Sequence, residues 1–409
     1  MPTHKVNLRH FFAMHEIANA GSIRAAAESV FMSQPALTRV LHKLDDLAGT
    51  PLFERSGFGV AETAAGEVLV RRARRAIALL VDAEREIRAR FPATSTGSPL
   101  YRHVTSSQLH ALVAVVETGG YSTAARRLGL AQPTVHRAAK ELEKIIGVDL
   151  FPHAARGVEP SEAARRLARS AQLVFAEIRQ GFEEVKELQG TTDSRIAVGC
   201  LPLARSEFLP TAITRLLSTY PDARVSILDG PYIEQLHALR YGQIDWLLGA
   251  LRQPVPTRDV IQEALFDQPL VVVVRPGHPL LESDSPDIAE LAKLEWVAPR
   301  SLAPAREFFD ALFDRNGVDA PTRIIECSSL IATRGLLRQS DRAALLSPLQ
   351  VREDVSAGDL AILIDAIPGS SRSIGLTTRD NWEPTMVQAE FVKIVRELAS
   401  QIGTRQHSS

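Results

Sequence analysis

The stretch GSIRAAAESVFMSQPALTRVLHKLDDLAGTPLFERSGFGVAETAAG, residues 21–66, carries the strongest fold signal in the chain. Arg24 to Val30 is predicted to form a short helix whose small residues allow close packing. Ser33 is predicted to cap the next helix, with Pro35 in its first turn, where the missing N–H costs nothing. Residues 52–60 are predicted to form a small β-wing. A short helix, a tight turn, a second helix and a wing together make a winged helix-turn-helix.

The second helix of this unit carries polar residues on its outer face, while Leu37 and Leu41 point to the core. Gln and Arg on such a helix can make paired hydrogen bonds to base edges in the major groove, and an Arg on the wing can reach a phosphate. The alternative is that these side chains are only solvated. The predicted DNA-contacting residues of this unit are Ser33, Gln34, Pro35, Thr38, Arg39, His42, Lys43 and Arg55.

The same pattern recurs 98 residues later without an insertion, so the first half of the chain is a tandem duplication. The first copy contains Ala26-Ala27, Gln34-Pro35, Arg39, Leu52-Phe53 and Gly59-Val60. The second copy has the same residues, in the same order, at Ala124-Ala125, Gln132-Pro133, Arg137, Leu150-Phe151 and Gly157-Val158. Ala131 replaces the capping Ser33, which loses about 0.5–2 kcal/mol of helix stability. The second copy either contacts DNA or is a degenerate domain kept for dimer packing. Its predicted DNA-contacting residues are Gln132, Thr134, His136, Arg137, Lys140 and Arg156.

A long amphipathic helix is predicted after each copy. The predicted units are a first winged helix-turn-helix at 5–66, a linker helix at 67–90, a flexible linker at 91–104, a second winged helix-turn-helix at 105–163 and a second linker helix at 164–190. On the first linker helix, Leu69, Ile77, Leu80 and Val81 form an apolar stripe that needs a partner.

Residues 21–66 resemble the N-terminal domain of the LysR-type transcriptional regulators. The resemblance rests on the Ala-Ala pair, Ser33 to Thr38, Leu44 to Leu47, Leu52 to Arg55 and Thr63 to Gly66. It implies a regulator that binds double-stranded promoter DNA, with linker helices that pair two subunits of a homodimer or homotetramer. The family normally has one such module, and this chain has two.

From Arg195 onward, short β-rich runs alternate with helical stretches, which predicts a mainly parallel sheet covered by helices. Gly242-Gln243-Ile244-Asp245 and the run from Val274 to Leu280 resemble the effector domain of the same family, which has a periplasmic-binding-protein fold. The expected fold class is therefore multidomain, with two all-α winged helix-turn-helix domains and one α/β two-lobed effector-binding domain at 193–400. Lobe I is expected at 193–264 and 368–400, and lobe II at 265–367.

A small-molecule effector is expected between the two lobes, because ligands of open α/β sheets bind beyond the carboxyl ends of the strands. Arg205 or Arg300 could pair with a carboxylate through the guanidinium fork, although an arginine at such a position is more often a surface residue. The effector is expected to be an aromatic or other organic acid, or a sugar. The predicted effector-binding residues are Leu203, Ala204, Arg205, Pro231, Tyr232, Gly249, Ala250, Arg300, Ser301, Ser328, Ser329 and Ser347.

Charge distribution and composition indicate which classes of protein are compatible with the sequence. The formal net charge is −1, but residues 1–190 hold 25 Lys and Arg against 20 Asp and Glu, whereas residues 191–409 hold 22 against 28. A basic front and an acidic rear suit a nucleic-acid binder with a second task. No apolar run is long enough for a membrane span, and residues 1–10 lack a secretion signal, so a cytoplasmic protein is expected.

Other functions fit the sequence less well than DNA-binding regulation. An enzyme is disfavoured because no acid-base pair, phosphate loop or metal cluster is evident, and neither a cofactor nor a metal is predicted. An exported solute-binding protein would explain only the rear half. A thiol sensor would need a reactive Cys200 or Cys327. The main alternative is a small-molecule-binding protein whose helix-turn-helix modules serve oligomer assembly.

Overall fold

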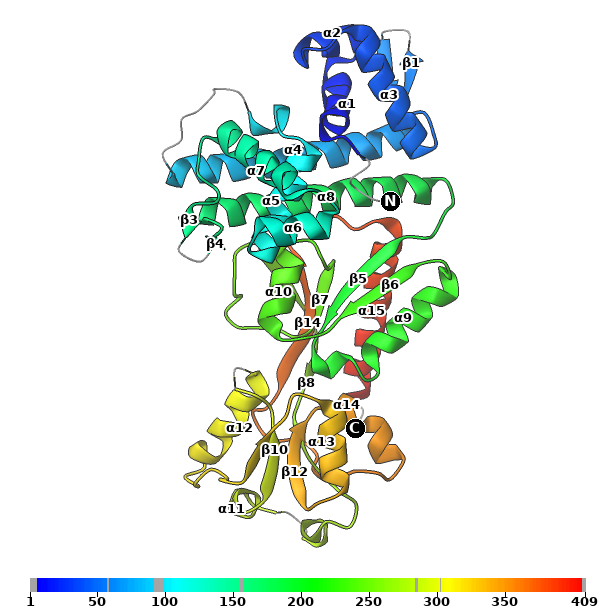
Figure 1. Ribbon diagram of the computed structural model, residues 1–409. Helices are drawn as coiled ribbons and strands as arrows, with labels where there is room; N and C mark the ends of the chain where they lie inside the picture. Colours follow the sequence, from blue (N-terminus) through cyan, green and yellow to red (C-terminus); the bar gives the residue numbers. More distant parts are fainter. Residues whose placement is uncertain are drawn as a thin grey trace.

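The computed structural model describes residues 6–56, 59–91, 99–154, 157–283, 286–301 and 303–406. Helices α1 to α8 make up the first half of the chain, and a two-lobed α/β assembly makes up the second (Figure 1). Two long helices, α4 and α8, run between these halves. None of the described helices has both the length and the apolar character needed to cross a bilayer.

The first unit contains three helices and a two-stranded antiparallel sheet. Its elements are α1 (Leu8–Ala20), α2 (Ile23–Ser29), α3 (Gln34–Ala48), β1 (Phe53–Ser56) and β2 (Gly59–Glu62). The predicted cap of α3 is confirmed, because the Ser33 hydroxyl accepts a hydrogen bond from the Ala36 N–H at 3.3 Å. Gly49 ends α3 in the left-handed region, with φ at 70°, where a glycine carries no steric cost. Leu37 and Leu41 are buried, as their spacing predicts.

The second unit repeats this layout. Its elements are η2 (Leu100–Arg102), α5 (Ser106–Thr118), α6 (Tyr121–Leu128), α7 (Gln132–Ile146), β3 (His153–Ala154) and β4 (Gly157–Val158). Ala131 precedes α7 without a side-chain cap, as expected from the missing hydroxyl. At the other end of α7, Glu143 accepts hydrogen bonds from the backbone N–H groups of Leu150 and Phe151, both at 3.0 Å, which fixes the turn after the helix.

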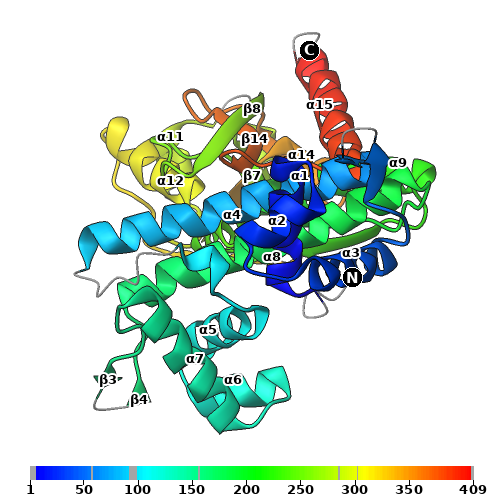
Figure 2. The ribbon, with the colours of Figure 1, turned by 90° about the horizontal axis from the view of Figure 1, so that it is seen from above.

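The linker helices are α4 (Ala64–Arg90) and α8 (Glu162–Leu188), and each begins two or three residues before its predicted start. They lie side by side and run in opposite directions (Figure 2). The partner of the apolar stripe on α4 is therefore α8 of the same chain. Leu69, Ile77 and Leu80 are buried there. Val81 was wrongly included in the stripe, because it is 39% exposed.

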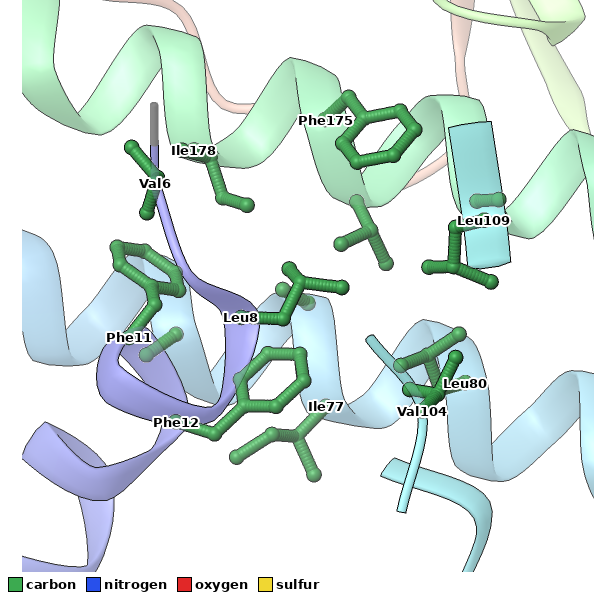
Figure 3. Packing of buried hydrophobic residues seen from close by; sticks show 14 of the residues in the cluster. Val6, Leu8, Phe11, Phe12, Ile77, Leu80, Val104, Leu109, Phe175 and Ile178 are labelled. Carbon is green, nitrogen blue, oxygen red and sulfur yellow. The ribbon is translucent and has the colours of Figure 1, made fainter. Parts of the chain in front are cut away.

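One continuous hydrophobic core joins the two units through the helix pair. Figure 3 shows Ile77 and Leu80 of α4 on one side and Phe175 and Ile178 of α8 on the other, with Leu8 of α1 lying between the two helices. Phe182 of α8 also contacts Phe11 of α1, with ring centroids 6.5 Å apart. The described residues between 6 and 188 therefore share one core, and the two units do not fold as separate domains.

The second half contains two five-stranded sheets of mixed direction. The lobe I sheet has the order β6-β5-β7-β14-β8, from β5 (Arg195–Cys200), β6 (Arg224–Leu228), β7 (Trp246–Ala250), β8 (Val260–Gln268) and β14 (Arg372–Arg379). The lobe II sheet has the order β11-β10-β12-β9-β13, from β9 (Val271–Val274), β10 (Glu295–Ala298), β11 (Ile324–Glu326), β12 (Arg342–Leu346) and β13 (Ala361–Ile364). Strands β8 and β14 pair along their length and lead into lobe II. Because β8 stays in the first sheet as far as Gln268, lobe I extends beyond the expected boundary at residue 264.

Helices cover both sheets. Those of lobe I are α9 (Phe208–Thr219), α10 (Tyr232–Arg240) and α15 (Met386–Gln406), with the short η3 (Pro202–Ala204). Those of lobe II are α11 (Ile288–Ala292), α12 (Pro304–Arg315), α13 (Leu330–Arg338) and α14 (Pro348–Ser356), with η4 (Pro279–Glu282). Each lobe has its own core, in which Trp246 and Trp296 are fully buried.

Candidate functional site

The outer face of α3 carries the polar side chains that the sequence predicts to meet DNA. Gln34, Arg39 and Lys43 are exposed, and Arg39 and Lys43 form no hydrogen bond or ion pair with the described part of the chain. Thr38 is half-buried, and its hydroxyl donates to the Gln34 carbonyl at 3.0 Å. Ser33 uses its hydroxyl as the cap. This face therefore leaves an amide and two cations free for a polyanionic partner.

Further predicted residues surround this face. Pro35 and His42 are exposed, and His42 Nδ1 lies 4.0 Å from Asp45 Oδ2. Arg55 lies on β1, opposite Val60 of β2, and is exposed without an ion pair among the described residues. Since strand and helix belong to one small unit, cations are placed on both the helix and the wing, which is the distribution that base and phosphate contacts require.

The outer face of α7 resembles that of α3 but holds more internal contacts. Arg137 is exposed and unpaired within the described residues, as Arg39 is. Gln132 accepts from the Ser122 hydroxyl at 2.7 Å, and the His136 ring lies edge-on to Tyr121 at 4.9 Å. Lys140 is paired with Glu143 at 2.7 Å. A shallow hollow over this face is lined by Gln132, Pro133, His136, Arg137 and Lys140.

Two other predictions for this copy have different outcomes. Thr134 is exposed on the same face of α7. Arg156 lies outside the described residues.

Tyr121, which lies beside His136, is a neutral ring. Burial, with a further contribution from Glu143 and Asp149, raises the pKa of Tyr121 to about 12, so this ring stays neutral under all ordinary conditions.

The predicted effector-binding residues of lobe I fall into two groups. Leu203 and Ala204 are buried in the lobe I core, so their side chains are taken up by packing within the lobe. They are apolar residues of η3 that pack inward beneath the end of β5. The Arg205 side chain is held within lobe I by two contacts. Its Nε donates to the Cys200 carbonyl at 3.1 Å, and its Nη1 lies 3.4 Å from Asp229 Oδ2.

The remaining lobe I predictions lie at the start of α10 and at the end of β7. Pro231 is exposed and Tyr232 is half-buried at the start of α10. Gly249 has φ of 153°, and a Cβ there would lie 2.5 Å from the Leu201 Cβ, so only glycine fits this close approach. Ala250 ends the strand beside it and is half-buried.

The lobe II predictions are mostly surface positions. Arg300, Ser301 and Ser328 are exposed, and Ser329 caps α13 by accepting from the Ala332 N–H at 3.3 Å. Ser347 is fully buried at the start of α14. These residues do not form one cluster in the contacts of the structure.

Sequence reasoning missed two arginines that the structure brings together at the crossing between the lobes. The Arg252 guanidinium lies 4.2 Å from the centre of the Tyr232 ring, and its Nη1 donates to the Ala250 carbonyl at 3.1 Å. Burial lowers the pKa of Arg372 to about 10, with a further contribution from Arg252. Arg372 Nε and Tyr232 Oη are buried without a hydrogen-bond partner among the described residues.

The chemistry of this cluster favours an anion. Two guanidinium groups that repel each other lie in a partly buried position, and no ion pair joins either of them to a carboxylate of the described chain. A carboxylate would relieve the repulsion and satisfy the free Nε. No sequence motif surrounds Arg252 or Arg372, and only the fold shows that they are neighbours.

Cys200 has the opposite character. Burial raises its pKa to about 12, so it carries almost no thiolate at neutral pH. Cys327 is half-buried, with its Sγ 3.4 Å from the Ser329 carbonyl. Neither environment favours a thiol sensor.

The helix pair and the effector lobes meet at a buried ionic cluster. Arg72 of α4 is completely buried, and its Nη1 donates to Glu177 Oε2 at 2.8 Å and its Nε to Glu184 Oε1 at 2.7 Å. Its Nη2 donates to the backbone carbonyl of Glu383 at 3.1 Å, between β14 and α15. Arg75 also donates to Glu177, at 3.0 Å, and to Glu383 Oε1, at 2.8 Å. One cluster therefore joins α4, α8 and lobe I.

Comparison with known proteins agrees with both halves of this description. The model of the bacterial regulatory helix-turn-helix proteins of the lysR family matches residues 8–67 and 106–179, and the model of the LysR substrate-binding domain matches residues 189–400. The chain belongs to the LysR family of transcriptional regulators. It is accordingly a DNA-binding regulator with an effector-binding domain, and not an enzyme.

Individual LysR relatives align over long stretches. The chain is 34% identical to the HTH-type transcriptional regulator GalR of Pseudomonas putida over 395 residues, covering 97% of this chain and 98% of GalR. It is 28% identical to the regulator PcaQ of Agrobacterium fabrum over 72% of this chain and 94% of PcaQ.

Solved structures share the fold. A full-length OxyR variant from Pseudomonas aeruginosa gives a TM-score of 0.54 at 21% identity, over 73% of this chain and 95% of OxyR. Full-length CbnR in complex with its target DNA gives 0.51 at 21% identity, over 72% of this chain and 99% of CbnR.

Proposed function

We propose that this LysR-type regulator reads DNA with two winged helix-turn-helix modules, residues 5–66 and 105–163, and that α3 and α7 are their recognition helices. The observation that carries the proposal is the pair Arg39 and Arg137. They occupy equivalent positions in the two copies, and both are exposed and unpaired within the described residues. Unpaired cations on two matching helices suit a partner that supplies phosphates and guanine edges.

Selection of duplexes from a randomised pool by the full chain tests this proposal. An enriched motif should contain base pairs whose preference relaxes in Arg39→Ala. A bidentate contact to a guanine is worth about 1–3 kcal/mol, so specific binding should weaken about 10- to 100-fold while binding to random duplex changes less. Arg85→Ala, on the exposed side of α4, is the matched control and should bind normally.

Two outcomes would contradict the DNA contacts. Equal weakening on selected and random duplexes would reduce Arg39 to a phosphate contact. Absence of any enriched motif would favour the alternative, in which the helix-turn-helix modules serve assembly and the chain is chiefly a small-molecule binder.

We propose further that the effector is an organic carboxylate held at Arg252, Arg372 and Tyr232. The two guanidinium groups would bind the carboxylate, and the Tyr232 ring offers an apolar face beside it for an aromatic or other flat group. The unpartnered Arg372 Nε and Tyr232 Oη support this position over Arg300, which is exposed on lobe II.

Calorimetric titration with a panel of aromatic and aliphatic carboxylates, each beside its primary amide, tests the effector proposal. The acid of at least one pair should bind and its amide should bind at least about tenfold more weakly, because a charge-assisted fork is lost. Arg372→Leu should abolish the difference and Arg300→Leu should preserve it. The reverse ranking of the two variants, or binding of neutral sugars alone, would overturn this assignment.

A further inference from the structure

The pairing of α4 with α8 follows a constant register. Arg90 pairs with Glu162 at 2.9 Å and Glu86 pairs with Arg166 at 2.9 Å. Further along, Arg75 pairs with Glu177 and Arg72 with Gln180. As the α4 residue number falls from 90 to 86, 75 and 72, its α8 partner rises by the same steps, from 162 to 166, 177 and 180. The helices are therefore antiparallel without a break in register.

This register coincides with a two-fold axis of the duplication. Each residue of the first copy corresponds to the residue 98 positions later, so Ile77 corresponds to Phe175. The same two residues are opposite each other in the antiparallel register, and both belong to the shared core. In an antiparallel helix pair, a position that lies opposite its own repeat equivalent marks the two-fold axis that relates the two repeats. The two copies are thus related within one chain as two subunits of a symmetric dimer are related.

A second contact near the axis has the same property. Leu8 and Ser106 are also repeat equivalents, and the Leu8 N–H donates to the Ser106 hydroxyl at 3.2 Å. That hydroxyl in turn donates to the Val6 carbonyl at 2.8 Å. Val6 and its equivalent Val104 are both buried there. The first turns of α1 and α5 therefore meet close to the axis and fix the two units relative to each other.

The ionic cluster specifies pairing between unlike helices. Arg72 and Arg75 both donate to Glu177, whose equivalent on α4 is Leu79. A pair of two α4 helices would leave Arg72 buried with fewer carboxylates, which is costly. A pair of two α8 helices would lack both arginines, because their equivalents are Ser170 and Leu173. The α4–α8 pair is the combination that satisfies these charges.

From these observations we infer that a single chain spans both half-sites of one inverted-repeat operator, with α3 on one half-site and α7 on the other. The inference rests on the proposed function, since it needs both modules to contact DNA. Figure 2 shows α1–α3 toward one end of the helix pair and α5–α7 toward the other. Two modules related by a two-fold axis match the dyad that relates two half-sites of a duplex.

The operator should be an imperfect inverted repeat. The chain should bind it in one orientation, with each module on its own half-site. Gln34 and Arg39 have identical equivalents in Gln132 and Arg137, so the two half-sites should share a core. Lys43 corresponds to Glu141, so the flanks should differ. Because there is one effector domain for two modules, the orientation on the duplex decides to which side of the operator that domain projects.

The test compares Arg39→Ala and Arg137→Ala, in the full chain, on a selected duplex whose two half-sites carry distinguishable base changes. Each variant should lose about 10- to 100-fold in affinity, and each should lose base preference and backbone protection in one half-site only, a different one for each variant. Scrambling the half-site that a variant no longer reads should cost that variant little further affinity. This readout does not depend on whether chains associate through their effector domains.

The opposite pattern would overturn the inference. If Arg39→Ala relaxes both half-sites and Arg137→Ala relaxes neither, two chains supply two copies of α3 to one operator. That result would leave DNA recognition by the first module intact. If the wild-type chain enriches no motif at all, the proposed function itself fails, which is a separate and recognisable outcome.

Discussion

Replacement of Arg72 by methionine should destabilise the helical half of the molecule selectively. The wild-type guanidinium is completely buried and donates to Glu177, Glu184 and the Glu383 carbonyl. Burial lowers its pKa, but the two carboxylates together outweigh this and the pKa is raised, so Arg72 is always charged. Its removal leaves two nearly buried carboxylates with fewer donors.

Arg75 and Arg71 remain to pair with Glu177 and Glu184, so the cost should lie near the lower end for a broken buried pair, about 3 kcal/mol. With a urea dependence of about 2–3 kcal/mol per molar, the transition of the helical half should fall by roughly 1 M. The matched control is Arg85→Met, on the same helix, where an exposed pair with Asp82 contributes at most about 0.5 kcal/mol.

The two halves can be followed separately because all three tryptophans, Trp246, Trp296 and Trp382, belong to the effector lobes. Circular dichroism at 222 nm reports the helices of both halves, whereas tryptophan fluorescence reports the lobes alone. Arg72→Met should move the dichroism transition to lower urea ahead of the fluorescence transition. If both transitions of Arg72→Met coincide with those of Arg85→Met, the buried cluster does not hold the helix pair together.

Three further predictions concern the helix pair and the thiols. Gly181→Leu should lower the free energy of unfolding, followed by the dichroism transition, by about 1–3 kcal/mol, because even a Cβ there would lie 3.0 Å from Leu69 Cδ2. A smaller loss of stability than for replacement of a surface glycine would contradict the close approach. Burial raises the pKa of Glu183 from 4.5 to about 7, so the folded chain retains a proton that the unfolded chain releases between these pH values. The free energy of unfolding should therefore fall as pH rises through that window, and Glu183→Gln should flatten the slope; an unchanged slope would assign it to other groups. In the native protein, Cys200 should resist alkylation by iodoacetamide at pH 8, whereas Cys327, which is partly accessible, should react first. Mass spectrometry of the digested protein distinguishes the two sites.

Much of the fold is local enough to be predicted from the sequence. The cap at Ser33, the glycine end of α3 at Gly49 and the weaker start of α7 at Ala131 depend on neighbouring residues and the backbone conformation they favour. The strand and helix alternation after Arg195 depends on hydrophobic spacing in the same way. Such signals need no knowledge of the tertiary structure.

Predictions that needed a distant partner were less successful. The apolar stripe on α4 shows that a partner is needed, but periodicity does not say whether it comes from the same chain. Leu203 and Ala204 lie after a strand, as ligand-binding residues often do, yet their apolar side chains pack inward. Arg252 and Arg372 are far apart in sequence and come together only because β7 and β14 are neighbours in one sheet.

Strand β14 connects the proposed effector residues with the helix pair. It begins at Arg372, and the segment that follows its end contains Glu383, whose carbonyl accepts from Arg72. A ligand that reorients Arg372 would therefore act on a strand whose other end is bonded to the buried cluster between α4 and α8. Because both three-helix units share the core around that helix pair, a change at the cluster would alter the relation between α3 and α7. A shift in that relation changes how well one chain fits the spacing of two half-sites, which is a physical route from effector to operator that needs no second subunit.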